Sequence, residues 1–522
     1  MTEITLRMLP EAAADKHKIV RRAAEMLSIK PSKISDVQIT YRSIDARHSP
    51  VVFQMNVAVF TDGETRNEEP FKIDYQNVGG KQEVIVVGAG PGGLFAALQL
   101  IELGLKPIVV ERGCDVSTRK RDVAALNHNN PVNPESNFAF GEGGAGTFSD
   151  GKLNTRSKKR GDFRRFLEIL CLHGAHRSIL VDAQPHIGTN HLPHVIVAMR
   201  QTIIAHGGEV HFNTKMTSIL TKDGRVTGIA TSTGKTFNAN AIILATGHSA
   251  QDVYLCLHNS HIAIEAKPFA MGVRIEHPQR LIDCLQYHTQ SGRGDYLPAA
   301  SYSFVTQVGG RGVYSFCMCP GGHIVPAMTA PDEMVVNGMS TSQRNSNYAN
   351  SGFAVEVRLD DLTAYKQHGA LAALMFQKEI EHTFFRNCRQ HIVAPAQRLN
   401  DFMGGRLSVD LPQCSYHPGI ISAPVHSILP DLISQNLREG LQIIGNRARG
   451  FLTNEAVVVA PETRTSSPVR IPRNPTTLEH IHLRGLFPCG EGAGYAGGIA
   501  SSAIDGALCG AKAAEYLRSA YP

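Results

Sequence analysis

The sequence predicts an α/β protein in which a Rossmann-like domain, discontinuous along the chain, holds an inserted lobe and follows a small N-terminal α/β module. Three observations predict this fold class. A short apolar strand at 84–87 runs into a glycine-rich turn and a helix. A second apolar strand at 107–110 ends on the acidic residue Glu111. A strand, a glycine-rich turn and a helix recur between 486 and about 517. Strands that alternate with helices in this way are typical of a parallel sheet.

Composition narrows the class of protein. Of the 522 residues, 42% are hydrophobic and 19% are charged, which provides for sizeable cores and excludes a disordered polymer. The net charge of +6 permits an anionic partner but is too small for a nucleic-acid coat. No apolar run is long enough to span a membrane, and the first residues lack the pattern of a secretory signal. The ten cysteines include no Cys-x-x-Cys pair, so we expect reduced thiols in a cytoplasmic protein.

Changes of pattern divide the chain into four segments. Residues 1–78 alternate as strands around one amphipathic helix and form the N-terminal module. Residues 81–250 form the first part of the dinucleotide-binding domain, including a small antiparallel meander before a buried strand at 241–247. Residues 251–480 form a substrate or cap lobe, and residues 481–522 complete the binding domain.

The turn after the first apolar strand is a dinucleotide fingerprint, G-x-G-x-x-G. Gly88 permits the tight turn, Gly90 lets backbone approach a pyrophosphate, and Gly93 lets the helix pack close to the strand. The intervening Pro91 and Gly92 open the helix, whose N-terminus offers N–H donors and a positive dipole. Glu111 is placed to accept both hydroxyls of the adenosine ribose, and Arg112 follows it.

Two distant segments favour FAD over NAD(P) as the dinucleotide. Thr246-Gly247, after an apolar strand and a meander, is similar to the turn where two-domain flavoproteins leave the FAD domain. In the C-terminal segment from Gly490, the Glu491 carboxylate is placed to accept a ribityl hydroxyl. The helix that follows aims its dipole at the pyrophosphate or at the N1–C2=O edge of the flavin. Its first residues are Gly497, Gly498 and Ile499.

A glycine-rich loop at 141–152 supplies further backbone donors for non-covalently bound FAD; the alternative is a surface loop. The residues assigned to the cofactor here and in the meander are Gly143, Gly144, Gly146, Thr147 and Thr217. Small residues at helical spacing in the last helix (503, 506, 507, 510 and 511) predict close packing against the sheet.

The whole arrangement resembles the glutathione-reductase-type FAD fold. More narrowly, the chain resembles a bacterial family of FAD-dependent dehydrogenases often described as NAD(FAD)-utilising dehydrogenases, and the resemblance runs essentially from end to end. It is carried by four long motifs, at Tyr41–Arg47, Gly143–Leu153, Tyr314–Gly322 and Glu462–Arg470. The resemblance implies FAD binding and does not specify a substrate.

Three groups of residues allow alternative interpretations. The first is a basic run that comprises Lys152, Arg156, Lys158, Lys159, Arg160, Arg164 and Arg165. It is either a binding surface or a solvated face. As a binding surface it would hold an anionic substrate, the phosphate of NADPH, or RNA. Cys317 and Cys319, two apart in an apparent strand, would share one face. We expect structural thiols there, with redox chemistry and metal binding as alternatives, and we expect no metal site. Arg464 is placed either to put a cation near flavin N1 or to form an internal ion pair.

Together these features predict an FAD-dependent oxidoreductase that transfers a hydride between flavin N5 and a small-molecule substrate, which is possibly anionic. Lys152 and Arg464 are the candidate catalytic residues. Because there is one dinucleotide fingerprint and not two, NAD(P)H would be a transient reductant without a domain of its own. The alternatives are a flavin-dependent RNA-modifying enzyme and a flavin-holding electron carrier or sensor. Nucleic acid is the less favoured partner, no membrane partner is expected, and the oligomeric state stays open.

Overall fold

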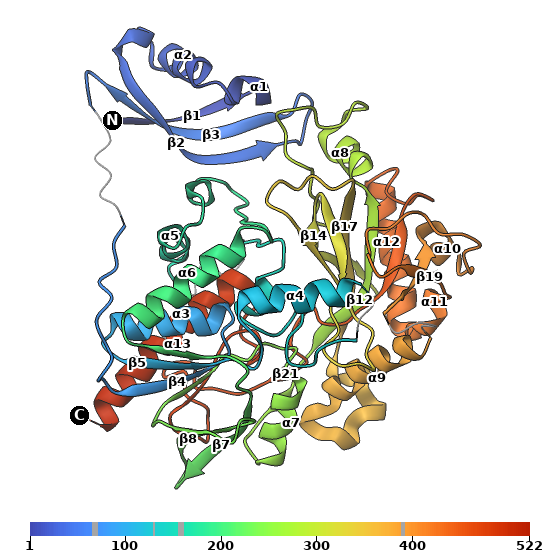
Figure 1. Ribbon diagram of the computed structural model, residues 1–522. Coiled ribbons are helices and arrows are strands. Elements are labelled where there is room, and N and C mark those ends of the chain that lie inside the picture. Colours follow the sequence, from blue (N-terminus) through green and yellow to red (C-terminus); the bar gives the residue numbers. More distant parts are fainter. Residues whose placement is uncertain (65–70, 129–130, 155–160, 388–391, 522) are drawn as a thin grey trace.

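The computed structural model describes residues 1–64, 71–128, 131–154, 161–387 and 392–521. It confirms the α/β class. Three parts are visible in Figure 1. The first is a small module at the N-terminal end, and the second is a sheet-and-helix domain that contains both the glycine fingerprint and the C-terminal helix. The third is a lobe whose sequence lies between the two segments of that domain.

The N-terminal module is a three-stranded antiparallel sheet with its helices on one face (Figure 1). Its strand order is β1-β3-β2. Its elements are β1 (Thr2–Met8), α1 (Pro10–Ala13), α2 (Lys16–Leu27), the 3-10 turn η1 (Pro31–Lys33), β2 (Ile34–Asp45) and β3 (Val52–Thr61). Ile19 and Ala23 of α2 bury against Met55 and Val57 of β3, because alternate strand residues and helix positions four apart each share a face.

The boundary expected at residue 78 lies too late in the chain. Phe71, Ile73 and Tyr75 pack against the core of the second domain. Val78 is fully buried there, and its N–H donates to the carbonyl of His206. The segment from 71 onward therefore belongs to the dinucleotide-binding domain, and the described part of the module ends before residue 65.

The second domain has a five-stranded parallel sheet in the order β22-β10-β4-β5-β6. Its strands are β4 (Glu83–Val87), β5 (Lys106–Val110), β6 (Glu209–His211), β10 (Ile242–Leu244) and β22 (Leu486–Pro488). Its helices and turns are α3 (Pro91–Glu102), α4 (Val116–Asn127), η2 (Gly144–Gly146), α5 (Phe163–Leu172), η4 (Arg177–Leu180), α6 (Leu192–Ala205) and α13 (Ile499–Ala520). Since β22 pairs with β10, the C-terminal segment completes a sheet begun 400 residues earlier, as the discontinuous domain requires.

The meander is present as an antiparallel sheet of β7 (Met216–Lys222), β8 (Arg225–Thr231) and β9 (Thr236–Asn238). The helix α7 (Gln251–Asn259) and residues 469–471 pack in the same hydrophobic core as this meander. The lobe, expected to span 251–480, therefore begins after α7 and ends before residue 469.

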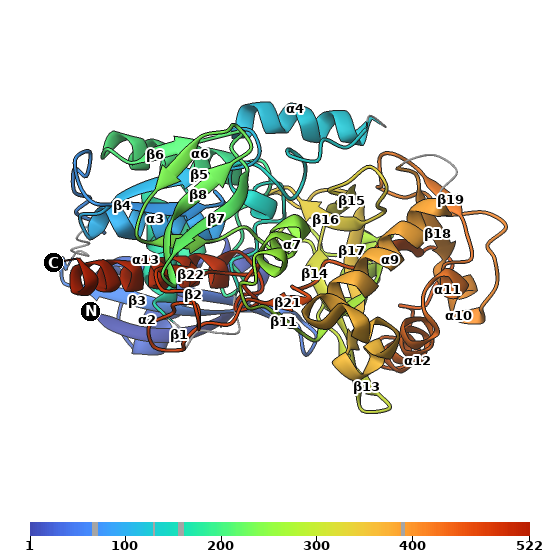
Figure 2. The same cartoon turned by 90° about the horizontal axis from the view of Figure 1, so that it is seen from below.

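The lobe is built on a seven-stranded sheet in the order β13-β14-β17-β12-β20-β18-β19. Its strands are β12 (Phe269–Pro278), β13 (Val305–Val308), β14 (Arg311–Cys319), β15 (Gly322–Pro326), β16 (Val336–Ser340), β17 (Tyr348–Val357), β18 (Ala394–Arg398), β19 (Ile420–Ser422) and β20 (Val457–Glu462). A separate antiparallel pair, β11 (Glu265–Ala266) and β21 (Val469–Arg470), flanks these strands in the chain, and Val469 packs in the core of the meander. Its helices are α8 (Gln279–Tyr287), η5 (Leu359–Leu371), α9 (Ala372–Arg386), α10 (Leu399–Gly404), α11 (Val425–Ile428) and α12 (Asp431–Arg447). On one face α12 packs closely, since a Cβ at Gly440 would lie 2.6 Å from the Val313 side chain. The β15–β16 hairpin covers the other face, where Gly338 lies against Arg274 and Asn350. Figure 2 shows this lobe beside the second domain.

The last helix packs closely, but its nearest neighbour is another helix. A Cβ at Gly506 of α13 would lie 2.0 Å from the carbonyl oxygen of Gly92 in α3, and one at Gly510 would lie 3.0 Å from that of Ala96. The close packing that was expected against the sheet is therefore made mainly against α3. The small residues let α13 lie against this helix, with Gly506 of α13 beside Gly92 in the first turn of α3.

Candidate functional site

A cavity of about 540 Å³ opens where the second domain meets the lobe. One wall consists of the glycine segments at 88–92, 144–151, 245–250 and 489–499, and the opposite wall comes from β14 to β16 and from residues 464–466. Its volume lies within the usual range for a cofactor pocket. Segments that are far apart in the sequence thus converge on one site, as expected of a dinucleotide held by three separate motifs.

Most of the residues assigned from the sequence line this cavity. These are Gly88, Gly90, Pro91, Gly92, Glu111, Arg112, Gly144, Gly146, Lys152, Thr246, Gly247, Arg464, Gly490, Glu491, Gly497, Gly498 and Ile499. Gly93, Gly143 and Thr147 lie behind the wall and support it. Thr217 is exposed on β7 and lies off the cavity, whose wall there is formed by Thr214–Met216.

The fingerprint turn has the geometry that its glycines require. Gly88 has a φ of 102°, and a Cβ on it would lie 2.5 Å from the carbonyl oxygen of Ala245. A Cβ on Gly93 would lie 1.8 Å from the carbonyl oxygen of Gly88, so α3 can approach β4 this closely only without a side chain there. Gly90 is the N-cap of α3 and Pro91 its first residue, which leaves the helix N-terminus facing the cavity.

The glycine-rich loop at 141–147 is held by a buried arginine that we did not anticipate from the sequence. Arg119 of α4 has no exposed surface, and its guanidinium donates to the carbonyls of Asn137, Phe138, Gly141 and Glu142. Burial lowers the pKa of Arg119 to about 10, so it stays charged at neutral pH. The loop is further tied to the fingerprint because the N–H of Gly143 donates to the carbonyl of Ala89 at 2.8 Å.

The Glu111 carboxylate accepts hydrogen bonds mainly from the backbone. Its Oε2 accepts from the N–H of Ala89 at 2.8 Å, and its Oε1 accepts from those of Gly113 and Gly141, each at 3.0 Å. A carboxylate offers about four acceptor positions, so about one remains. Glu111 therefore joins the fingerprint to the glycine-rich loop and keeps about one acceptor position for a ligand. Its contact with the ribose stays a prediction.

At the same end of the cavity Arg112 belongs to an ion network. Its guanidinium lies 4.0 Å from the centroid of the Phe140 ring and donates to Glu135 and Asp252. Lys215 bridges the same two carboxylates. The network fixes the ring of Phe140 and the strand at Thr214–Met216, which are the surfaces here that suit a flat aromatic base.

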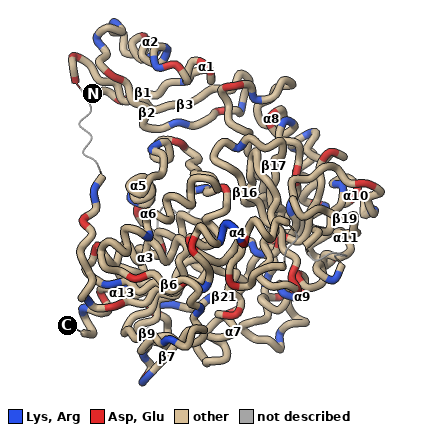
Figure 3. The backbone as a smooth tube through the Cα atoms, in the orientation of Figure 1, with Lys and Arg blue, Asp and Glu red and all other residues tan. Residues whose placement is uncertain are grey.

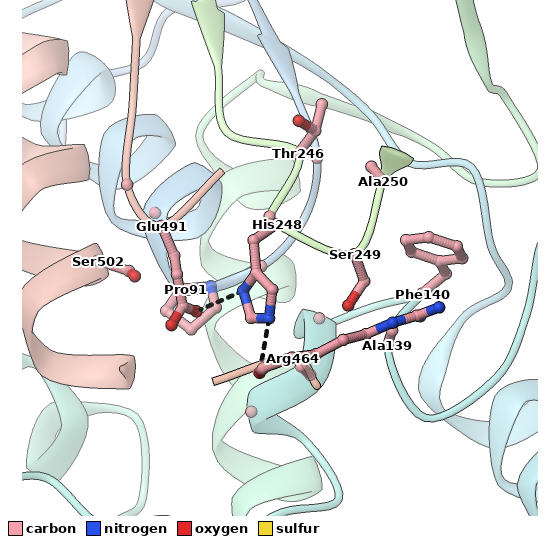
Figure 4. A pocket seen from close by; sticks show the side chains of 18 of the residues that line it. Pro91, Ala139, Phe140, Thr246, His248, Ser249, Ala250, Arg464, Glu491 and Ser502 are labelled. Atoms are coloured by element: carbon pink, nitrogen blue, oxygen red, sulfur yellow. Dashed lines mark hydrogen bonds and ion pairs between the residues drawn. The ribbon is translucent and has the colours of Figure 1, made fainter. Parts of the chain in front are cut away.

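His248, which directly follows Thr246-Gly247, is a second residue of the site that we did not predict from the sequence. Its Nδ1 lies 3.4 Å from the Glu491 carboxylate, and its Nε2 lies 3.0 Å from the carbonyl oxygen of Arg464 (Figure 4). Burial by itself would lower the pKa of His248, but the negative charge of Glu491 and these two hydrogen bonds raise it. The arrangement therefore favours an imidazolium in the wall of the cavity.

The guanidinium of Arg464 does not supply the expected cation for flavin N1. It forms ion pairs with Glu333 at 2.6 Å and with Glu381 at 2.8 Å, and it donates to Thr329. These buried carboxylates raise the pKa of Arg464 against the effect of burial and neutralise its charge. The internal ion pair is the alternative that the structure bears out, and Arg464 meets the cavity alongside His248, which binds its backbone carbonyl.

The lobe side of the cavity carries Lys152 and Cys317. The Nζ of Lys152 lies 3.9 Å from Asp150, whose stronger partner is Arg344 at 2.6 Å. Cys317 lies on a bulge of β14 and has a φ of 46°, so the regular strand expected for Cys317 and Cys319 is corrected. Within the basic run, Arg156 to Arg160 lie outside the described residues.

One cluster among the described residues has the side chains of a metal site, but a positively charged arginine lies against it. Cys489, Asp505 and Cys509 lie within 4.8 Å of one another and are buried. The guanidinium of Arg473 lies against this cluster and donates to both oxygens of Asp505 and to the Cys509 sulfur. An arginine in direct contact with two of the three groups makes this a structural ion pair.

The unanticipated residues left different traces in the sequence. Arg119 lies in the buried stripe of α4 with Val116, Val123 and Leu126. An arginine at an apolar position of a helix could have indicated a buried cation. The helix itself was missed because 112–160 is rich in glycine and polar residues. The lining residues Asn337 and Gly338 come from a hairpin that only tertiary packing brings to the site.

Comparisons with known proteins agree with this geometry. Residues 83–120 match the model of an FAD binding domain, 182–312 that of an FAD dependent oxidoreductase, and 268–465 that of an FAD-dependent protein, C-terminal domain-like. Residues 1–60 match a domain of unknown function. A protein of Clostridium beijerinckii described as uncharacterized is 39% identical over 525 residues, covering 96% of each chain. The chain belongs to a family of FAD-dependent proteins. It binds FAD and is an oxidoreductase.

Solved structures give only distant similarities. A geranylgeranyl bacteriochlorophyll reductase-like protein from Thermoplasma acidophilum aligns with 84% of this chain and 80% of its own, at 12% identity and a TM-score of 0.37. The quinol fumarate reductase subunit FrdA of E. coli aligns with 84% and 72%, at 14% identity and a TM-score of 0.35. These likenesses are too weak to bear on the chemistry of the site. Among the described residues, no helix combines the length and apolar character needed to cross a membrane.

Proposed function

We propose that the protein transfers a hydride between a small-molecule substrate and position N5 of its bound FAD. The observation that carries this proposal is the shared cavity, in which the FAD-binding domain and the lobe form opposite walls. Bound FAD would supply the hydride chemistry, and a substrate between the two walls would lie against the flavin with water excluded.

Positive electrostatic potential at one wall of the cavity supports this proposal, because a reduced flavin is anionic. The 22-residue helix α13 starts at the cavity, so its N-terminal N–H groups and dipole face the ligand. His248, paired with Glu491, adds a partly neutralised cation. We propose that the helix terminus stabilises the N1–C2=O edge and that Glu491 accepts a ribityl hydroxyl, in place of the guanidinium of Arg464.

The position of Lys152 supports the proposal that the substrate is an anion. Its side chain is about a third exposed, at 31%, in the wall of the cavity, and its contact with Asp150 at 3.9 Å is long. Asp150 is mainly engaged by Arg344, so Lys152 keeps most of its charge for a ligand. The neighbouring lobe residues Tyr314 and Phe316 add aromatic surface. The substrate that fits is a small organic anion.

Within the FAD-dependent proteins, we propose that this chain is an NAD(FAD)-utilising dehydrogenase of the bacterial cytoplasm with a glutathione-reductase-type FAD fold. NADH or NADPH would then be a transient reductant. The single dinucleotide fingerprint and the four long sequence motifs support this assignment. Free thiols at each of the nine described cysteines suit a reducing compartment.

A nucleic-acid substrate has less support. Of the basic run, Arg164 pairs with Glu168 and Arg165 with Glu102, so these two charges are largely satisfied within the protein. Figure 3 shows basic and acidic residues interspersed over all three parts of the chain. We therefore favour the small molecule. Binding of a tRNA pool that weakens steeply with added salt would reverse this preference.

The test is anaerobic stopped-flow reduction of the holoprotein with NADH and NADPH, followed by a screen of small anionic oxidants. We expect bleaching of the flavin band and its recovery with at least one oxidant. Lys152→Met should weaken the apparent affinity for that oxidant by about tenfold, the effect of one lost charge-assisted contact. Lys120→Met, on the exposed face of α4, is the matched control and should change nothing. A flavin that dithionite reduces but no hydride donor reduces would contradict the proposal.

A further inference from the structure

Two thiols at the lobe side of the cavity have different environments. Cys317 is exposed, and it lines the cavity, whereas Cys319 is fully buried behind it. The strand is interrupted between Phe316 and Cys319, where β14 has one more residue than its partner β17. Cys317 sits in this bulge with a φ of 46°, a conformation that is uncommon for residues with a side chain and frequent at functional sites.

The two cysteines are also in contact. The Cys319 thiol donates to the carbonyl oxygen of Cys317 at 3.3 Å. Arg274, buried on the far side, donates to the same carbonyl at 3.1 Å. The bulge thus interrupts the regular strand on which both side chains would share one face.

The surroundings divide the two thiols into an acidic and a weakly acidic one. The Cys319 thiol and the charges of Lys152 and Arg274 lower the pKa of Cys317 to about 6, against desolvation by the surrounding protein and the charge of Asp150. The same contact and burial raise the pKa of Cys319 well above its usual value. At neutral pH the pair therefore consists of a thiolate that faces the cavity and a thiol behind it. Redox dithiols that divide attack and resolution between two sulfurs have this asymmetry.

We propose that Cys317 and Cys319 form a dithiol–disulfide couple that exchanges two electrons with the FAD in the cavity. The proposal requires only that the cavity holds FAD and does not depend on which substrate gives or takes the hydride. In the oxidising direction the Cys317 thiolate and the Cys319 thiol become joined by an S–S bond, and the S–H bond of Cys319 breaks. The proton and the two electrons released pass to FAD, which becomes the anionic reduced flavin. The reverse reaction consumes the same proton and electrons.

Metal binding and passive packing explain the pair less well. Among the described residues, the only group of three ligand-type side chains within metal-binding distance is the one at Cys489, so this pair has no third ligand. A packing role suits the buried Cys319 but not Cys317, whose thiol is exposed to the site on a bulged backbone.

The experiment is an anaerobic reductive titration of the holoprotein after oxidation with diamide and removal of the reagent. We expect wild type to take up four electrons per chain, two for the disulfide and two for the flavin. Cys317→Ser and Cys319→Ser should each take up two. Cys284→Ser, in α8 and away from the cavity, is the matched control and should take up four.

A second measurement on wild type keeps the proposal testable if the variants lose FAD. Peptide mapping with differential alkylation should find Cys317 joined to Cys319 after diamide and both thiols free after reduction. In the reduced protein, the alkylation rate of Cys317 should rise with pH around 6, well below the range of an ordinary thiol. A wild-type titration of two electrons, with both thiols free in the diamide-treated map, would overturn the proposal. The flavin absorbance recorded in the same titration separates that result from a failure to bind FAD.

Discussion

Replacing Glu111 by Gln should weaken both the folded structure and the binding of FAD. The carboxylate accepts three buried backbone N–H groups, from Ala89, Gly113 and Gly141. An amide in the same position retains one acceptor oxygen, which can keep the two bonds at the Oε1 side. Its NH₂ group then faces the N–H of Ala89, donor against donor.

The magnitude follows from these three bonds. Losing one charge-assisted hydrogen bond costs about 1.5–3 kcal/mol, and turning two others into neutral bonds costs about 1 kcal/mol each. The sum is about 3.5–5 kcal/mol, a large part of the stability of a typical domain. Because the fingerprint and the glycine-rich loop both lose an anchor, FAD affinity should fall by more than the tenfold to hundredfold expected from a ribose contact alone.

The assay for Glu111→Gln is urea unfolding of the FAD-free protein together with FAD titration by fluorescence quenching. Glu135→Gln is the matched control: it removes a carboxylate from the Arg112 network that is 42% exposed, and it should cost about 1 kcal/mol or less. If Glu111→Gln lowers FAD affinity while the FAD-free protein unfolds at the wild-type urea concentration, then the carboxylate serves the ribose and our reasoning about the backbone is wrong.

Three further outcomes are expected. Arg464→Met should destabilise the protein by about 3–5 kcal/mol, because two buried carboxylates lose their partner. Arg358→Met, at an exposed pair, is the control and should change stability little; equal urea midpoints for the two variants would contradict the account. Gly506→Val should separate α13 from α3 at Gly92 and strongly weaken FAD binding, as measured by equilibrium dialysis; unchanged affinity would refute the role given to this contact. His248 has a raised pKa, so its contribution to stability is present in full below about pH 6.5 and is lost as pH rises through the raised value. The difference in unfolding free energy between wild type and His248→Asn should therefore shrink over that pH range. A difference that does not depend on pH would count against the imidazolium.

Local sequence chemistry accounts for the parts of the site that could be predicted. A tight turn before a helix requires glycine at 88 and 93 whatever the rest of the chain does, and both positions have the expected close contacts. The order of strands, glycine turns and helices likewise predicted that residues 490–499 return to the first fingerprint.

Contacts between distant segments account for what could not be predicted. The role of Arg464 depends on Glu333 and Glu381, which lie more than eighty residues away. Glu111 stands where a ribose ligand is expected, but the backbone of a loop thirty residues further on takes its acceptors. The register shift at Cys317 depends on the pairing of β14 with β17, and an isolated strand pattern contains no trace of it.

The central claim is that the cavity between the glycine segments and the lobe holds one FAD without a covalent bond. The most direct measurement is heat denaturation of the purified or FAD-reconstituted protein, followed by filtration and chromatography of the released cofactor. We predict one FAD for each 56.7-kDa chain in the filtrate and a colourless protein pellet. Release of FMN, a pellet that stays yellow, or a protein that takes up no FAD would contradict the account.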